Sequence, residues 1–243
     1  MKINLVCSLF VLDNELNSNI RKNDIKKIKV LVDKDEHKLP NVNFDDKTDI
    51  KELLRKHITT IIGSGDFHLE QVFTLGDAKY YGDQNIDIIY IAVANIESVK
   101  KLDDNFELLD FGVYSNSSVK FGEVSYNFKT REKINKNNIE YVHDIDVNDI
   151  SLEKVLLELL IAFKYLRTRV DFSDIMFKFM GSVFTLEDVR SVYEIITEKT
   201  VDKSNFRKKI VKYCEKVDSI IDSKGHRPTQ MYKFKPLTND IWL

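Results

Sequence analysis

The sequence predicts an α+β fold in two parts, a strand-rich N-terminal part and a helical C-terminal part that ends in two strands. Three observations support this prediction. Strand-type apolar patterns recur through the first part, a long apolar helix follows it, and the balance of charge changes sign between the two parts. We place the boundary after residue 148, so that the parts span residues 1–148 and 149–243.

The composition is that of a globular protein. Of 243 residues, 43% are hydrophobic and 31% are charged, and no run of 18 apolar residues occurs. The N-terminal run MKINLVCSLFVLD lacks a small-residue cleavage site, which favours a first strand over a signal peptide. Cys7 and Cys214 are far apart and form no ligand spacing. We therefore expect a cytoplasmic protein without a disulfide framework.

The N-terminal part alternates strands with one helix. The run DIKELLRKHITTII predicts a helix over 49–62, because its apolar residues follow the helical period and Gly63 and Gly65 end it. The run LPNVNFDDKTD before it is predicted as a loop. Alternating or continuous apolar runs predict strands at 3–12, 27–33, 69–75, 86–94 and 106–111, and a hairpin formed by 119–128 and 139–142.

The segment from Ser151 to Arg169 is predicted as one long helix without proline or glycine. Its broad apolar face consists of Leu152, Val155, Leu156, Leu159, Leu160 and Phe163. A helix this apolar needs partners on more than one side. That requirement fits a helix that joins the two parts, or two subunits, and equally an internal core helix.

Two helices with a short turn between them are predicted next, after a short helix at 173–180. Thr185, followed three residues later by Asp188, is typical of a helix start. The buried stripe of the first helix is Leu186, Val189, Val192, Tyr193 and Ile196. The run KTVDK ends it, and Asp202 is the N-cap of the second helix. The expected inward residues of the second helix are Phe206, Ile210, Val211 and Cys214.

The outward face of the second helix carries the residues expected to bind duplex DNA: Lys203, Ser204, Asn205, Arg207, Lys208 and Lys212. Asparagine and arginine side chains can pair bidentately with adenine and guanine edges, and lysines bind phosphates. Strands at 217–222 and 229–235 then enclose a basic tip with Lys224, His226 and Arg227, as a wing requires. This order of elements predicts a winged helix-turn-helix.

The distribution of charge supports this prediction, although the net charge is only −2. Residues 1–150 carry 20 Lys+Arg against 26 Asp+Glu, whereas residues 199–235 carry 11 against 4, a balance of +7. A local excess of cations marks where a polyanion would bind. The alternative is a solvated lysine-rich face.

Three runs in this region resemble the C-terminal domain of the Nudix-related transcriptional regulators, the NrtR family: FTLEDVRSVYE, VDKSNFRKK and KGHRPTQMYKFK, within 183–235. The resemblance implies that Lys203, Asn205, Arg207 and Lys208 lie at the major groove and phosphates and that Arg227 belongs to the wing. Ser204 stands where the family often has a basic residue, and His226 lengthens the wing motif. Both departures affect the operator sequence that would be recognised.

The resemblance also implies an N-terminal Nudix-like α/β/α sandwich, with Leu39-Pro40 at the family's LPGG loop and 49–62 at the Nudix helix. The hydrolase motif G-x5-E-x7-R-E-U-x-E-E-x-G-U is eroded, because Asn41 and Val42 replace its paired glycines. His57, Thr60 and Ile61 replace its three clustered glutamates. Glutamates at those positions hold Mg²⁺ for metal-assisted hydrolysis. We therefore expect no enzyme activity, no metal and no cofactor.

The resemblance implies a homodimer on a palindromic operator and a repressor controlled by a small effector. The lack of a long apolar run predicts no membrane association. The effector would be ADP-ribose, a related nucleotide connected with NAD metabolism, or a sugar, and its candidate residues are Arg55, Lys56, His57 and Asp77. Two alternatives remain open. An active hydrolase with an appended winged helix would be identified by turnover, and a protein-interaction adaptor by DNA binding that does not depend on salt.

Overall fold

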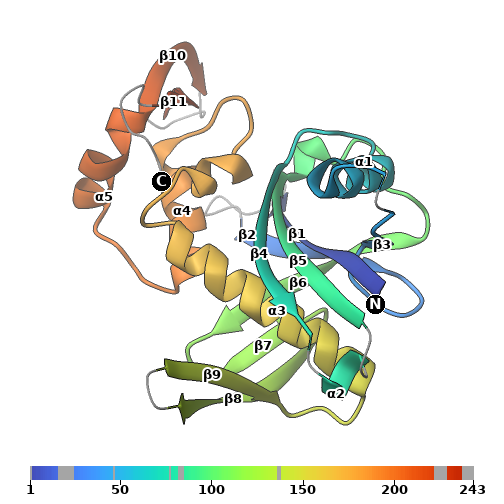
Figure 1. The fold of residues 1–243 in the computed structure, drawn as a ribbon. Helices are drawn as coiled ribbons and strands as arrows, with labels where there is room; N and C mark the ends of the chain where they lie inside the picture. Colours follow the sequence, from blue (N-terminus) through green and yellow to red (C-terminus); the bar gives the residue numbers. More distant parts are fainter. Residues whose placement is uncertain are drawn as a thin grey trace.

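The computed structural model describes residues 2–15, 25–45, 47–76, 78–81, 85–135, 138–221 and 229–236. In these residues nine strands form one curved sheet, and two more strands form a separate antiparallel pair. Figure 1 shows the long helix α3 crossing the sheet, with β1, β4 and β5 on one side of it in this view and β7, β8 and β9 on the other, and with the C-terminal helices beyond its end. None of the described helices has the length and apolar character needed to cross a membrane.

The centre of the sheet is the parallel pair β1 (Lys2–Glu15) and β5 (Asn85–Asn95), and the other neighbours are antiparallel. The order is β4-β5-β1-β2-β6-β7-β8-β9, and β3 pairs with β1. The strands predicted at 3–12, 27–33, 69–75, 86–94 and 106–111 are confirmed. The last four are β2 (Ile25–Asp33), β4 (His68–Leu75), β5 and β6 (Phe106–Tyr114).

One helix covers each face of the sheet, which confirms the predicted α/β/α sandwich. Side chains on β1 point alternately to the two faces, as the strand period requires. Leu5, Cys7, Leu9 and Val11 pack with α1 (Ile50–Ile62), whereas Val6, Phe10 and Leu12 pack with α3 (Ile150–Arg169). Gly63 ends α1 at φ 69°, where an added Cβ would lie 3.0 Å from the Lys101 nitrogen. This position therefore requires glycine.

The prediction of a simple loop at LPNVNFDDKTD is wrong in part, because β3 (Asn41–Asn43) lies within it. The reason is the register of β1. Strand β2 pairs only with residues 10–15 of β1, so β3 hydrogen-bonds along residues 4–6 on the same edge. A short polar strand of this kind has no sequence period of its own. The four-residue helix α2 (Ala78–Tyr81) was likewise not predicted.

The predicted hairpin of 119–128 and 139–142 is also corrected, since the chain forms three strands there. They are β7 (Ser118–Phe121), β8 (Val124–Asn135) and β9 (Asn138–Ile145). Gly122, at φ 60°, begins a two-residue turn that brings Phe121 opposite Val124. Glycine adopts this left-handed conformation without steric cost, so the chain reverses inside the segment that the apolar pattern treated as one strand.

The C-terminal part has the order of elements expected for a winged helix. A 3-10 helix, η2 (Ile175–Phe179), precedes α4 (Leu186–Thr197) and α5 (Lys203–Ile210). After η3 (Val211–Tyr213), β10 (Cys214–Ile221) pairs with β11 (Thr229–Phe234). Phe184 forms a further antiparallel bridge with Tyr232 through two main-chain hydrogen bonds of 2.9 and 2.8 Å.

Of the residues predicted to face inward from the second helix, Val211 does not do so, and Cys214 packs against the core from a strand instead of the helix. Phe206 and Ile210 are buried, as expected, but α5 ends at Ile210. Val211 is 37% exposed, and Cys214 is only half-buried and begins β10. The helical period was extended one turn too far, because η3 and β10 replace the last turn.

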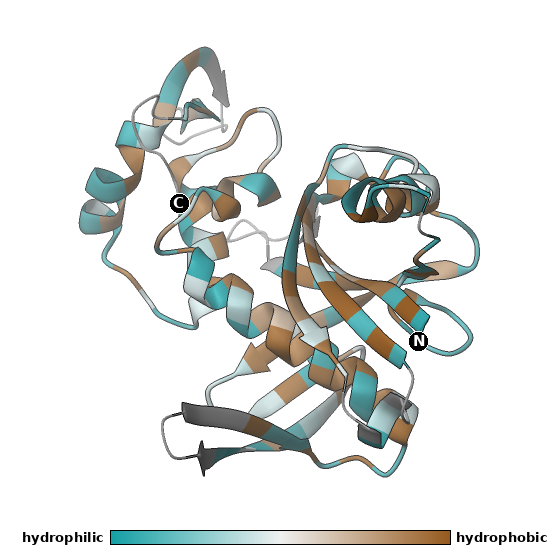
Figure 2. Cartoon of the chain, in the orientation of Figure 1, coloured by the Kyte–Doolittle hydropathy of each residue, from teal (hydrophilic) through white to brown (hydrophobic). Residues whose placement is uncertain are grey.

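Helix α3 joins the two parts of the protein, one of the roles that its apolar character allowed. It packs against the sheet and against α4, and the buried core runs continuously through it (Figures 1 and 2). Arg167 near its end donates to the carbonyls of Val113 on β6 (2.6 Å) and Ile196 on α4 (2.7 Å). A second hydrogen bond joins the two parts where β5 ends, because the buried Asn95 side chain donates to the Phe179 carbonyl of η2 (2.8 Å).

Candidate nucleic-acid interface

Helix α5 lies on the outer side of the winged helix, away from the large sheet (Figure 1). Its buried side chains, Phe206 and Ile210, hold it against the rest of this part, and the Phe206 ring lies 5.3 Å from that of Tyr193 on α4. Asp202 begins the helix, and its carboxylate accepts a hydrogen bond of 2.8 Å from the Asn205 amide. The helix therefore presents its remaining faces to solvent.

The structure brings five of the predicted DNA-binding residues together as exposed side chains on α5: Lys203, Ser204, Asn205, Arg207 and Lys208. Lys203 forms an ion pair of 3.3 Å with Glu187. Among the residues that the structure describes, none forms a hydrogen bond or ion pair with the side chain of Arg207 or Lys208. This hydrophilic face of α5 (Figure 2) thus has cations available for phosphates or base edges.

The other residues predicted to bind DNA are not part of this exposed set on α5. Lys212 is exposed but lies on η3, with its ammonium 4.6 Å from the centre of the Tyr213 ring. The predicted wing residues Lys224, His226 and Arg227 lie outside the described residues. A groove of about 540 Å³ lies between α4, α5 and the start of β11, and Arg207 and Gln230 are among the residues that line it.

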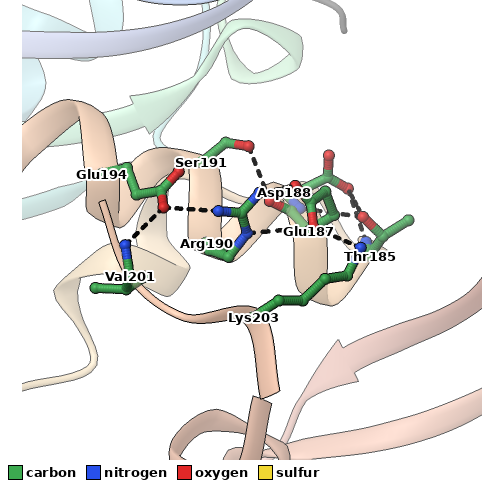
Figure 3. Close-up of polar contacts among 8 residues, drawn as sticks. All are labelled: Thr185, Glu187, Asp188, Arg190, Ser191, Glu194, Val201 and Lys203. Carbon is green, nitrogen blue, oxygen red and sulfur yellow. Dashed lines mark hydrogen bonds and ion pairs between the residues drawn. The ribbon is translucent and has the colours of Figure 1, made fainter. Parts of the chain in front are cut away.

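The turn between α4 and α5 is held by a network that the sequence analysis did not identify (Figure 3). Arg190 forms ion pairs with Glu187 and with Glu194, the latter at 2.6 Å. The same Glu194 oxygen accepts a hydrogen bond of 2.9 Å from the Val201 amide, in the turn. The hydrogen bond from Arg190 and the contact with Lys203 hold the pKa of Glu187 below its usual range. Ion pairs at i, i+3 and i, i+4 were the available sequence signal.

This network fixes where α5 begins, because it joins α4 directly to the turn and to Lys203. The start of α4 is fixed separately by the predicted capping box. Thr185 accepts from the Asp188 amide at 3.1 Å, and Asp188 accepts from the Thr185 amide at 2.7 Å. The two helices of the motif thus have a defined relative position before any ligand binds.

We expect Glu194→Ala to loosen the turn and to lower stability by about 1 kcal/mol, because the Val201 amide and Arg190 lose their acceptor. Hydrogen exchange at the Val201 amide should accelerate, and DNA affinity should fall. Glu215→Ala is the matched control, since Glu215 forms an exposed ion pair of 3.4 Å with Lys233. Unchanged exchange at Val201 would contradict this role for Glu194.

On the N-terminal part, the structure separates the candidate effector residues. Consecutive residues of a helix are about 100° apart around its axis, so Arg55, Lys56 and His57 face different directions. Lys56 is exposed and forms an ion pair of 3.0 Å with Glu52. Arg55 donates to the carbonyls of Gly65 and Phe67, each at 3.2 Å. Asp77 lies outside the described residues.

His57 lies at a pocket of about 310 Å³ on the side of the predicted LPGG-like loop, together with Pro40 and Asn41. Burial lowers the pKa of His57. The other two motif positions offer little to a cation, because Thr60 donates to the Lys56 carbonyl at 3.0 Å and Ile61 is buried. Within the described ranges, no group of three or more His, Cys, Asp or Glu side chains is placed to hold a metal.

Comparisons with known proteins agree with this architecture. Residues 176–234 match the family described as the NrtR DNA-binding winged helix domain. NrtR of Shewanella oneidensis in complex with a 27mer DNA has a TM-score of 0.65 at 13% identity, covering 96% of this chain and 93% of that one. A second structure of Shewanella oneidensis NrtR has a TM-score of 0.62 at 14% identity, covering 97% of this chain and 94% of that one.

A MutT/nudix family protein from Enterococcus faecalis has a TM-score of 0.67 at 14% identity, covering 97% of this chain and 88% of that one. At these identities the structural similarities show the fold alone. No curated protein matches the sequence.

The fold and the exposed basic helix define a class of protein, in which a Nudix-like sandwich is joined to a DNA-binding winged helix. The resemblance to the NrtR family is confirmed. The C-terminal part carries an NrtR winged helix domain, and the whole chain has the fold of an NrtR protein. The matched range of 176–234 includes all of η2 except Ile175, together with α4, α5, β10 and β11.

Proposed function

We propose that this protein is a cytoplasmic transcriptional repressor that binds a palindromic operator as a homodimer. The observation that carries the proposal is the outward face of α5, where Arg207 and Lys208 are exposed within an NrtR winged helix domain. In a helix-turn-helix the second helix enters the major groove, and arginine pairs bidentately with guanine. Two copies related by a twofold axis would read half-sites about one helical turn apart.

We further propose that residues 1–148 form an effector-sensing domain and that residues 149–243 form the linker helix and DNA-binding domain. The effector would be ADP-ribose, a related nucleotide or a sugar. The junction supports such coupling, because two hydrogen bonds cross it: Arg167 donates to the Val113 carbonyl (2.6 Å), and Asn95 donates to the Phe179 carbonyl (2.8 Å). A ligand that changes this junction needs a coupling of only about 1–3 kcal/mol to switch DNA binding.

The test is DNA binding by the full chain. Duplexes are selected from a randomised pool, and their affinity is measured by fluorescence anisotropy between 50 and 200 mM salt. For 6–10 phosphate contacts, the affinity should fall by about 10³- to 10⁵-fold over this range. Selection of a palindromic sequence, with sedimentation of a dimer on it, would support the proposal. Binding that does not depend on salt or sequence would instead favour a protein-interaction adaptor.

We expect the purified protein to have no Mg²⁺-dependent activity on ADP-ribose or on a nucleoside diphosphate sugar. In a working Nudix helix, three glutamates hold the metal. His57, Thr60 and Ile61 occupy those positions here, and an isoleucine side chain has no donor atom for a cation. The assay is formation of the nucleoside monophosphate with and without added Mg²⁺, because hydrolysis of the pyrophosphate bond in these substrates gives two phosphomonoesters and no inorganic phosphate. Metal-dependent turnover would show that the protein is an enzyme.

A further inference from the structure

A second pocket, of about 370 Å³, lies where the Nudix-like sandwich meets the start of the winged helix domain. Its walls come from α1, from the start of β4 with the loop before it, from η1 (Ile96–Ser98) and from η2. It is separate from the pocket at His57, with which it shares no lining residue. Since Phe177, Lys178 and Met180 lie within the matched range 176–234, a ligand in this pocket would contact both parts of the protein.

The lining of this junction pocket is rich in cations. Lys51 and Arg55 come from α1, and Lys178 comes from η2. Asp66 is the carboxylate in the lining, and it accepts a hydrogen bond of 3.2 Å from Ser98. His68, the remaining titratable group, lies 3.3 Å from Glu70. Cations therefore outnumber carboxylates at the wall, and an anionic ligand is favoured.

The arginine in particular retains its charge for a ligand. The Arg55 guanidinium donates to two main-chain carbonyls and lies 4.7 Å over the Phe67 ring. Neither contact neutralises it. Lys51 forms no ion pair with any residue in the described ranges, whereas Lys178 pairs with Asp174 at 3.0 Å. A guanidinium held in position by the main chain, with two ammonium groups nearby, suits the oxygens of a phosphate.

The remaining wall is apolar, with Phe67, Phe177 and Met180 beside the cations. The volume lies within the range of small-molecule sites. We propose that the junction pocket binds a small phosphorylated molecule, which Lys51 and Arg55 on one side and Lys178 on the other hold between α1 and η2. This inference rests on the proposed function, because it identifies where an anionic effector would act on the DNA-binding domain.

The test uses calorimetry of the full chain with ADP, with inorganic pyrophosphate, and with adenosine as the uncharged comparison. ADP and pyrophosphate should bind and adenosine should not. Lys51→Glu and Lys178→Glu should each weaken ADP binding by about tenfold or more, since each replaces an attractive charge with a repulsive one. Lys129→Glu is the control. It makes the same change of charge at an exposed position on β8, outside the pocket, and should leave ADP binding unchanged.

A second readout separates this inference from the proposed function. ADP should change the DNA affinity of the unaltered protein by roughly 5- to 150-fold and that of Lys178→Glu much less. If ADP and pyrophosphate do not bind, or if Lys129→Glu weakens their binding as much as Lys51→Glu does, the junction site is wrong, although the proposed DNA binding is unaffected. If the protein binds no duplex DNA, the proposed function fails, while calorimetry still decides the pocket. Melting curves confirm that each variant folds.

Discussion

Replacing Arg207 by alanine is expected to weaken operator binding by about 1–3 kcal/mol, or roughly 5- to 150-fold in Kd. The side chain is exposed on the outward face of α5, and its guanidinium is the group best suited to a guanine edge in the major groove. The loss should be largest on the selected operator and small on random duplex, because a base contact carries sequence preference. Fluorescence anisotropy at constant salt measures both.

The matched control for Arg207→Ala lies two residues further along α5. Lys209→Ala removes the same charge, but Lys209 faces the protein, with its ammonium 3.2 Å from Asp171 and 5.7 Å from the centre of the Tyr193 ring. It should cost little DNA affinity. Lys208→Ala should reduce the salt slope by about one without changing sequence preference. If Arg207→Ala and Lys208→Ala both retain full binding, α5 is not the recognition helix.

Lys154→Met is expected to lower the free energy of unfolding by about 3 kcal/mol or more, because it removes a cation that contacts two buried carboxylates. On the inner side of α3, the Lys154 ammonium lies 2.7 Å from Asp87 and 3.6 Å from Glu158, whose side chains are each 3% exposed. Asp87 also accepts from Asn4 at 3.3 Å. Urea unfolding followed by circular dichroism measures the loss.

Two further variants test the cause of this loss. Lys56→Met removes a lysine whose ion pair with Glu52 is exposed, and it should change stability by at most about 0.5 kcal/mol. Adding Asp87→Asn to Lys154→Met should recover part of the loss, as a double-mutant cycle on interacting residues requires. A fully additive double variant would mean that the pair does not interact.

Local sequence signals were sufficient for the elements with a strong period or a clear cap. The apolar face of α3, the Thr185–Asp188 capping box and the glycine after α1 each specify their element from a few neighbouring residues. Strand β3 could not be predicted in this way. It exists because β1 has an unpaired edge, and the pairing of residues 41–43 with 4–6 is a non-local property.

The candidate functional residues divide in the same way. The exposure of the set on α5 follows from helical spacing once Phe206 is taken as buried, so it could be predicted from the sequence. The candidate effector residues were taken from adjacent positions on one helix, and adjacency in sequence does not bring side chains to one pocket. The pocket at the junction contains Lys51 and Lys178, which are more than 100 positions apart in the chain, so only the folded structure brings them together.

The length of α3 has a mechanical consequence. Twenty residues of α-helix form a rod of about 30 Å, with one end among the strands of the sheet and the other beside α4. A rod pivoted at one end amplifies rotation, so a tilt of about 5° displaces the far end by about 3 Å. Half-sites on B-DNA are about 34–36 Å apart. In the proposed dimer, the spacing of the two winged helices would change while the spacing of the half-sites stays fixed. A rotation of α3 by a few degrees at the sheet is therefore enough to move the two winged helices out of register with the major groove.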